Sequence, residues 1–137
     1  MDSKYILNIN EEKEFFRKNK DTNDVLISNS GLQYKVIKEG DGKHPEYDSR
    51  IAVNYIGRFI NGIEFDRSID KKNPAKFFLN KIIPGWGEGL QMMKEGSRYE
   101  FYIPSYLAYG EKGKPGFIEP YKALIFDITL IEVLEDR

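Results

Sequence analysis

The sequence predicts an α+β domain in which a curled antiparallel sheet of five to six strands wraps over one short helix. Two observations support this prediction. Apolar and polar residues alternate along several segments after position 25, which is the pattern of half-buried strands. Only residues 84–93 in that range have helical character, and short turns join most of the other segments, as in antiparallel sheets.

The predicted strands are recognised by their alternation. Leu32, Tyr34 and Val36 alternate with polar neighbours up to Gly40. The other strand-like segments are residues 50–60, 63–65, 76–79, 99–103 and 123–134. The dipeptide Asn61-Gly62 after the longest early segment is a strong hairpin signal. Residues 105–121, between the last two segments, contain several glycines and prolines and read as a loop.

The predicted helix carries the only tryptophan of the chain, Trp86. Pro84 suits the first helical position, where its missing N–H would be unpaired in any case. Gly85, Gly87 and Gly89 are unfavourable in a helix, each by about 1 kcal/mol relative to alanine. We interpret these glycines as a sign that something comes close to the first turn, and Gly85 as fitting close approach at a pocket. Taken alone, Trp86 fits a plain core residue better than a binding residue.

Residues 1–24 read as a charged extension that precedes the domain formed by residues 25–137. Residues 11–20 favour a helix, with Asn10 as its N-cap and basic residues at its end. Only Phe15 and Phe16 offer apolar contact there. We therefore expect a solvated helix that lies loosely on the domain, with a linker stub or dimerisation arm as the alternative.

The composition excludes several classes of function. A net charge of −1 and a pI of about 5.9 argue against a general nucleic-acid partner. The chain has no cysteine, and its single histidine, His44, lies in a polar stretch of loop composition. Thiolate chemistry is therefore excluded. With a single histidine, almost no residues are available for a multi-histidine metal site or a Ser–His mechanism. We expect neither a metal nor a cofactor.

The sequence also bears on location. No apolar run approaches the roughly 20 residues of a membrane-spanning helix. The first residues lack a charged segment followed by an apolar one, so no signal peptide is visible. We expect the chain as given to be cytoplasmic, or periplasmic if a signal peptide has been removed.

Several short motifs resemble, in order and spacing, the FKBP-type peptidyl-prolyl isomerases. They are Val53-Asn54-Tyr55-Ile56-Gly57, Phe65-Asp66, Ile82-Ile83-Pro84-Gly85-Trp86, Ala108-Tyr109-Gly110 and Leu124-Ile125-Phe126-Asp127. Residues from about 25 to 135 follow this pattern. Residues 89–96 and 101–105 are most similar to the bacterial branch typified by macrophage-infectivity-potentiator proteins.

The resemblance implies an enzyme that accelerates rotation about Xaa-Pro bonds in peptides and unfolded proteins, with no cofactor and with a pocket suited to macrolides. It also implies Asp66 and Tyr109 as catalytic residues. The substrate-binding residues that it implies are Tyr55, Phe65, Phe77, Ile82, Ile83, Trp86, Phe117, Ile118 and Phe126. A monomer is expected, with dimerisation through the N-terminal extension as the alternative.

Other interpretations of these residues stay open. Tyr55, Phe65 and Phe126 occupy alternating strand positions and could be plain core. Ile82 and Ile83 would face opposite ways in a strand, whereas both could meet a ligand in a strand-to-helix turn. The domain could also be a non-catalytic peptide-binding or chaperone module, or purely structural if its own side chains filled the pocket.

Asp66 has two interpretations. In one it forms a surface ion pair with Arg67, Lys71 or Lys72. In the other it lies at the pocket wall, hydrogen-bonded to Tyr109. We favour the second interpretation, largely because of the resemblance to the family, and also because an isolated charge near apolar surface is costly unless paired.

Three positions depart from the better-known eukaryotic pattern of the family. Ala75 stands where a pocket-edge phenylalanine is common. Lys71 replaces an arginine that would pair with Asp66, and lysine cannot make the forked contact of arginine. Glu119 stands where a second proline is usual. These departures bear on macrolide affinity and on peptide preference rather than on the fold.

Overall fold

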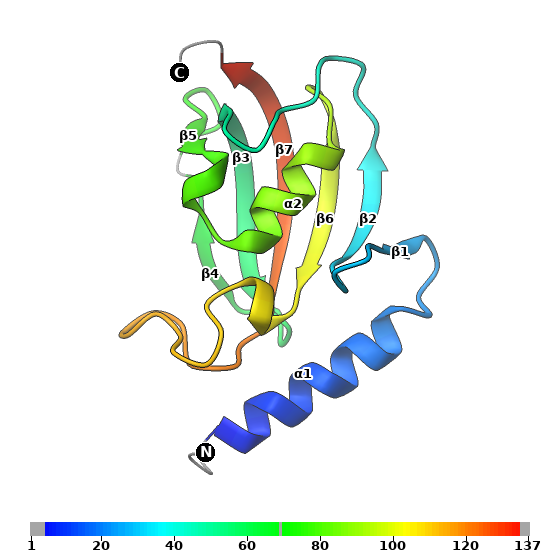
Figure 1. Cartoon of the computed structure of the whole chain (residues 1–137), viewed down its shortest axis with the longest axis vertical. Coiled ribbons are helices and arrows are strands. Elements are labelled where there is room, and N and C mark those ends of the chain that lie inside the picture. Colours follow the sequence, from blue (N-terminus) through cyan, green and yellow to red (C-terminus); the bar gives the residue numbers. More distant parts are fainter. Residues whose placement is uncertain (1–4, 69, 135–137) are drawn as a thin grey trace.

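The computed structural model describes residues 5–68 and 70–134 (Figure 1). Two α-helices, α1 (Ile6–Asn19) and α2 (Pro84–Met92), lie within these residues, with the single-turn helices η2 (Leu79–Lys81) and η3 (Ser105–Leu107). The strands are β1 (Val25–Ile27), β2 (Gln33–Lys38), β3 (Arg50–Phe59), β4 (Glu64–Arg67), β5 (Ala75–Phe78), β6 (Arg98–Ile103) and β7 (Leu124–Leu134).

The seven strands in the described residues form one antiparallel sheet in the order β1-β2-β6-β7-β3-β4. Strand β5 pairs with the first half of β3, and β4 pairs with its second half. The predicted antiparallel sheet is therefore confirmed, but the expected five to six strands were too few. The strand that was missed is β1, whose three residues Val25–Ile27 are too few to show a period of two.

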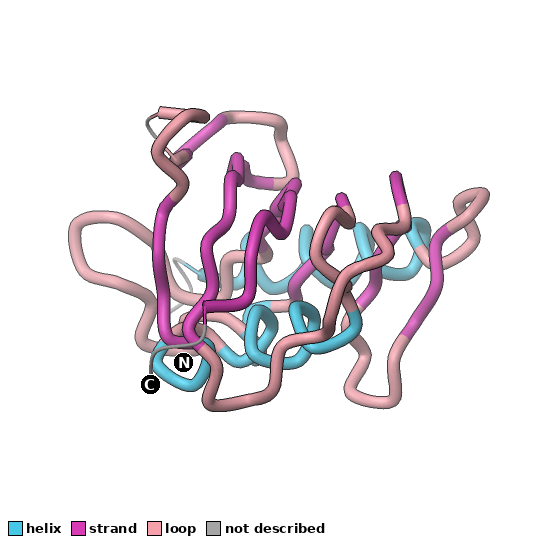
Figure 2. The backbone as a smooth tube through the Cα atoms, turned by 90° about the horizontal axis from the view of Figure 1, so that it is seen from above, coloured by secondary structure: helices cyan, strands magenta, loops and turns pink. Residues whose placement is uncertain are grey.

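Helix α2 packs against one face of the sheet, and the strands curve around it (Figure 2). Trp86 and Leu90 of the helix belong to the buried core. The sheet residues of the same core that are fully buried are Ile51, Val53, Phe101, Ile103, Leu124, Ile128 and Leu130. The predicted arrangement of one short helix under a curled sheet is confirmed, and it places Trp86 at the edge of the core.

The predicted hairpin after β3 is also present. The N–H of Gly62 donates to the carbonyl of Phe59 at 2.9 Å, and Gly62 has a φ of 91°. The Asn61 side chain accepts the N–H of Ile63 at 3.0 Å. Glycine and asparagine are therefore used as turn residues usually are, one for a left-handed backbone and one for a local side-chain hydrogen bond.

The glycines of α2 have a packing explanation. A Cβ on Gly85 would lie 2.6 Å from Ile103, and a Cβ on Gly89 would lie 2.6 Å from the ring of Phe101. Both neighbours are buried residues of β6. The close approach inferred from the sequence is therefore to the sheet, and the interpretation of Gly85 as a sign of close approach at the pocket was wrong. Gly87 has room for a methyl group, with its nearest neighbour 3.5 Å away.

The N-terminal helix differs from its prediction. It begins at Ile6, and its N-cap is Tyr5 rather than Asn10. It is not loosely attached, because Asn8, Glu12 and Asn19 all make hydrogen bonds to later parts of the chain. No sequence pattern indicated this attachment, because hydrogen bonds between distant side chains leave no periodicity in the sequence. Neither α1 nor α2, the helices of the described residues, is long and apolar enough to cross a bilayer.

The two internal glycines of α2 predict opposite effects of the same substitution. Gly89→Ala forces a methyl group against the buried Phe101 ring and should destabilise the domain by about 1–3 kcal/mol. Gly87→Ala meets only ordinary contacts and should be neutral, or stabilise by up to about 1 kcal/mol through helix propensity. Urea unfolding of both variants measures the difference. Equal destabilisation by the two substitutions would show that helix–sheet distance does not set the requirement for glycine.

Candidate functional site

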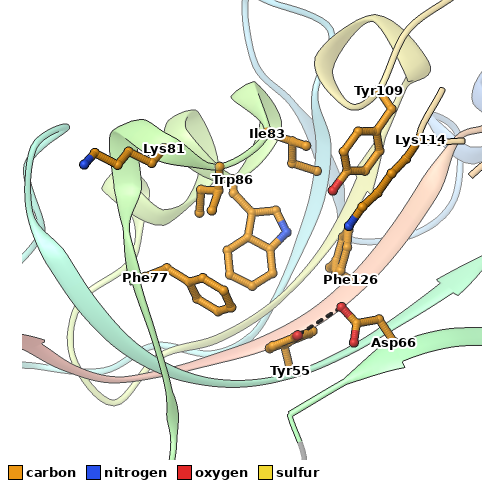
Figure 3. A pocket seen from close by; sticks show the side chains of 10 residues that line it. Tyr55, Asp66, Phe77, Lys81, Ile83, Trp86, Tyr109, Lys114 and Phe126 are labelled. Carbon is orange, nitrogen blue, oxygen red and sulfur yellow. Dashed lines mark hydrogen bonds between the residues drawn. The ribbon is translucent and has the colours of Figure 1, made fainter. Parts of the chain in front are cut away.

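The candidate site is a cavity of about 390 Å³ between α2, the sheet and the 105–121 loop (Figure 3). Its lining is mostly aromatic and aliphatic, with one carboxylate and two lysines. The lining residues are Tyr55, Asp66, Phe77, Lys81, Ile82, Ile83, Trp86, Tyr109, Lys114 and Phe126. An apolar cavity with a few convergent polar groups is typical of a ligand-binding site.

Trp86 lines this cavity and is only 4% exposed. Its ring centroid lies 5.2 Å from that of Tyr55, 5.5 Å from that of Phe77 and 5.2 Å from that of Phe126. All three pairs are edge-to-face, a favoured geometry for aromatic rings. Strands β3, β5 and β7 each supply one of these neighbours, so three separate segments hold the indole in place.

Two adjacent isoleucines reach the cavity from the connection between η2 and α2. Ile82 has an extended backbone, with φ of −119° and ψ of −178°, and Ile83 is the N-cap of α2. The backbone changes direction at this point, so neighbouring side chains are not forced to opposite faces as they would be in a strand. Both side chains line the cavity, as the alternative of a turn leading into the helix predicted.

Asp66 lies at the edge of the cavity and is exposed. The hydroxyl of Tyr55 donates to its Oδ2 at 3.0 Å, and the backbone N–H of Arg67 donates to its Oδ1 at 2.8 Å. The expected hydrogen bond between Asp66 and Tyr109 was therefore wrong, since Tyr55 makes that contact. The argument from the cost of a buried charge was also wrong, because this carboxylate remains in contact with solvent.

The alternative ion pair between Asp66 and Arg67 is not formed either. The Arg67 guanidinium instead makes a two-pronged contact with Glu64, with its Nε 2.7 Å from one carboxylate oxygen and Nη2 2.5 Å from the other. Asp66 is thus held by a hydroxyl and a backbone amide. Burial raises the pKa of Tyr55, and the hydrogen bond to Asp66 raises it further.

A second cavity of about 300 Å³ adjoins the first and shares Asp66, Tyr109, Lys114 and Phe126 with it. Its remaining lining residues are Phe65, Phe117 and Ile118. Ile118 is buried, whereas Phe117 is 75% exposed. The predicted binding residues therefore divide into two groups, one around Trp86 and one under the loop.

The sequence did not predict the two lysines of the first cavity. Lys114 lies beside both cavities, with its Nζ 5.8 Å from the centre of the Tyr109 ring and 5.3 Å from that of Phe117. Lys81 lies at the end of η2, with its Nζ 5.1 Å from the centre of the Phe78 ring. Lysines in loops and short turns follow no periodic pattern, so no signal in the sequence separates these two from other surface lysines.

The departures from the eukaryotic pattern lie outside the first cavity. Among the described residues, neither Ala75 nor Lys71 lines it. Ala75 begins β5, and the backbone carbonyl of Lys71 accepts a hydrogen bond from the Asn54 amide at 3.4 Å. Glu119 accepts a hydrogen bond from Asn8 of α1 at 3.2 Å. In this chain Glu119 therefore contacts the N-terminal helix.

Comparisons with known proteins agree with this geometry. Residues 41–131 match the family model of the FKBP-type peptidyl-prolyl cis-trans isomerase. The peptidyl-prolyl cis-trans isomerase Mip of Coxiella burnetii is 45% identical over 126 residues, which are 92% of this chain and 55% of that protein. The outer membrane protein MIP of Legionella longbeachae is 41% identical over 119 residues, covering 87% of this chain and 51% of that protein.

A crystal structure of a peptidyl-prolyl cis-trans isomerase from Pseudomonas syringae has a TM-score of 0.90 and 32% identity, covering 98% of this chain and 99% of that one. This chain therefore belongs to the FKBP-type peptidyl-prolyl cis-trans isomerase family, and the resemblance seen in its motifs is confirmed. The similarity to Mip proteins also confirms the bacterial branch. The chain spans about half the length of these two curated relatives.

The raised pKa of Tyr55 predicts how stability changes with alkaline pH. Above about pH 10 an unfolded tyrosine loses its proton, whereas folded Tyr55 keeps it. Unfolding then releases a proton, so the free energy of unfolding falls as pH rises, by at most about 1.4 kcal/mol per pH unit for one group. Tyr55→Phe should therefore make the decline between pH 9 and pH 11 shallower in denaturant titrations.

Tyr47→Phe is the matched control for this measurement, because Tyr47 is 59% exposed and lines neither cavity. It should leave the pH dependence of stability as in the wild type. A decline for Tyr55→Phe as steep as that of the wild type would contradict a raised pKa of Tyr55 in the folded chain.

Proposed function

We propose that this chain catalyses cis–trans isomerisation of Xaa-Pro bonds in peptides and unfolded proteins. The observation that carries the proposal is the aromatic cavity floored by Trp86, with Asp66 and Tyr109 at its wall. Its occurrence in a member of this family supports the assignment.

The reaction suits an apolar cavity. The barrier to rotation about an amide bond is roughly 18–20 kcal/mol, because twisting removes resonance. No covalent bond breaks, so the reaction itself needs no nucleophile and no metal. A 10⁴-fold acceleration requires only about 5–6 kcal/mol of transition-state stabilisation. The twisted amide has less charge separation than the planar one, so a dry apolar site favours the transition state over the ground state.

Each part of the lining has a role in this proposal. The proline ring packs on Trp86, which offers an apolar surface to a residue without an N–H. The Tyr109 hydroxyl donates a hydrogen bond to the substrate. Asp66, oriented by Tyr55 and by the N–H of Arg67, interacts with the carbon of the twisted carbonyl. The adjoining cavity takes an apolar side chain of the residue that precedes proline, because it is lined by aromatic and aliphatic residues together with Asp66 and Lys114.

A second candidate function is peptide binding without catalysis, as in a chaperone module. The observation that favours it is the exposed ring of Phe117 at the mouth of the second cavity. Such a ring gives apolar contact to an unfolded chain whether or not a proline is bound. The two functions can coexist, and an isomerisation assay separates them.

The organisation and location of the chain also belong to this proposal. We propose that residues 1–24 act as an extension to the domain of residues 25–137, with a monomer as the simplest state and dimerisation through the extension as the alternative.

Of the two locations considered above, the cytoplasm and the periplasm, the name of the Legionella relative, an outer membrane protein, favours the cell envelope. Fractionation of cells that express the natural gene distinguishes these locations.

The activity is tested with an Xaa-Pro peptide whose isomerisation is followed in the presence of the wild type and two variants. The wild type should exceed the uncatalysed rate. Tyr109→Phe removes one hydrogen bond, worth about 0.5–1.5 kcal/mol, and should lower kcat/KM by roughly 2- to 10-fold. Asp66→Ala should lower it by a similar factor or more, because it also leaves the Tyr55 hydroxyl without its partner.

Tyr47→Phe, which alters a tyrosine outside both cavities, serves as the control and should keep wild-type activity. A wild type that does not exceed the uncatalysed rate would refute the enzyme and leave the binding module. Full activity of Asp66→Ala would refute the role of that carboxylate alone.

The cavity itself is tested by titration with a macrolide of the kind that binds FKBP-type proteins. Because Trp86 is the only tryptophan, its fluorescence should change saturably as the ligand fills the cavity. Trp86→Phe should abolish the signal while calorimetry still detects weaker binding. Saturable binding with no change in tryptophan fluorescence would argue against Trp86 as the floor.

A further inference from the structure

The loop that carries Tyr109 is attached to helix α1 at both of its ends. The loop, residues 105–121, also carries Ile118 of the second cavity. In Figure 1 helix α1 lies beside this loop, outside the sheet. The contacts between them involve Glu12 and Asn8, two residues one turn apart on α1.

Glu12 holds the beginning of the loop. One of its carboxylate oxygens accepts the backbone N–H of Ser105, and the other accepts the Ser105 hydroxyl at 2.9 Å. The Ser105 carbonyl in turn accepts the N–H groups of Ala108 at 2.9 Å and Gly110 at 2.8 Å. These two residues flank Tyr109. A single serine, 5% exposed, thus connects the Glu12 carboxylate to the backbone on either side of Tyr109.

Asn8 holds the end of the loop. Its side-chain amide donates to the carbonyl of Pro120 at 3.1 Å and to the Glu119 carboxylate at 3.2 Å. The next residue, Tyr121, donates its N–H to the carbonyl of Gly110 at 3.0 Å. The second attachment therefore also leads, through one further hydrogen bond, to the residue that follows Tyr109.

The helix is fixed to the sheet independently of the loop. The Asn19 amide donates to Gln33 Oε1 at 2.9 Å, and the Gln33 amide donates to the carbonyl of Phe16 at 3.1 Å. The Phe15 ring lies 6.1 Å from that of Tyr102 in β6. Gln33, in β2, is only 4% exposed. The C-terminal half of α1 is thus anchored on β2 and β6, while its N-terminal half holds the loop.

The loop has a backbone that needs such support. Gly110, Gly113 and Gly116 have φ values of 60°, 65° and 83°. Glycine reaches many other conformations at little cost, so these positions do not restrict the loop by themselves. The hydrogen bonds to α1 come from an element whose backbone is already ordered, and they limit the conformations open to the Tyr109 segment.

We propose that Glu12 and Asn8 are positioning residues for the site, which hold the loop so that Tyr109 and Ile118 face the substrate. This inference rests on the proposed function, since it assigns the role of the loop to isomerisation. Neither residue touches either cavity, and both act through Ser105 and Pro120.

The test uses four variants of the full chain, each with a single substitution. Glu12→Ala removes the attachment at Ser105. Glu12→Gln preserves it, because the amide can accept from the N–H and donate to the hydroxyl oxygen. Asn8→Ala frees the other end and keeps the test valid if Glu12→Ala fails to fold. Glu11→Ala is the matched control, since Glu11 is the exposed neighbour on the same helix.

Two measurements are made well below the unfolding temperature of every variant: amide hydrogen exchange along the chain, and kcat/KM corrected for the folded fraction. Glu12→Ala and Asn8→Ala should speed exchange within residues 105–121 without changing exchange in β3 and β7. They should lower kcat/KM by roughly 3- to 10-fold, the effect of about one lost hydrogen bond on a positioned group. Glu12→Gln should stay within about twofold of the wild type, and Glu11→Ala should match it.

Wild-type exchange and activity in both alanine variants would overturn the proposal. Faster exchange spread evenly through β3 and β7 would also overturn it, because it would show a purely global loss of stability. If the wild type itself lacks isomerase activity, the proposed function fails, whereas the exchange measurement still decides whether α1 orders the loop.

Discussion

The close contact between α2 and β6 determines most of the architecture around the cavity. Gly85 and Gly89 remove the side chains that would separate the helix from Ile103 and Phe101. The helix can therefore lie deep against the sheet, and Trp86 reaches rings from β3, β5 and β7. A helix lifted by one methyl group would move the indole away from these rings and change the floor of the cavity.

The carboxylate of the site, Asp66, depends on few contacts for its orientation. Asp66 is exposed and keeps its orientation through the Tyr55 hydroxyl and one backbone amide. Tyr55 therefore has two tasks, packing its ring against Trp86 and orienting the carboxylate with its hydroxyl. Such a double role links the shape of the cavity to its electrostatics at one residue, and Tyr55→Phe separates the two because it keeps the ring and removes the hydroxyl.

Much of the fold and of the site could be predicted from the sequence, and the failures within the site have a common cause. Alternation along residues 50–60 and 123–134 located the two longest strands, and the motif around Trp86 pointed to a residue that lines the cavity. Strands and helices can be located from local patterns because their periods of apolar residues repeat within a single segment. The partner of Asp66, the docking of Glu12 on Ser105 and the lysine at position 114 depend on contacts between distant segments. No periodicity within one segment encodes which distant side chain it will meet.

The polar character of the contact between α1 and the rest of the chain has a thermodynamic consequence. The described attachment includes hydrogen bonds at Asn8, Glu12 and Asn19, and the Phe15 ring makes an apolar contact. Exposure of apolar surface raises the heat capacity of unfolding and exposure of polar surface lowers it, so the polar part of this contact does not add to that heat capacity. Separation of the helix from the domain must break these hydrogen bonds and the contact of Phe15 with Tyr102, a buried residue that is only 5% exposed.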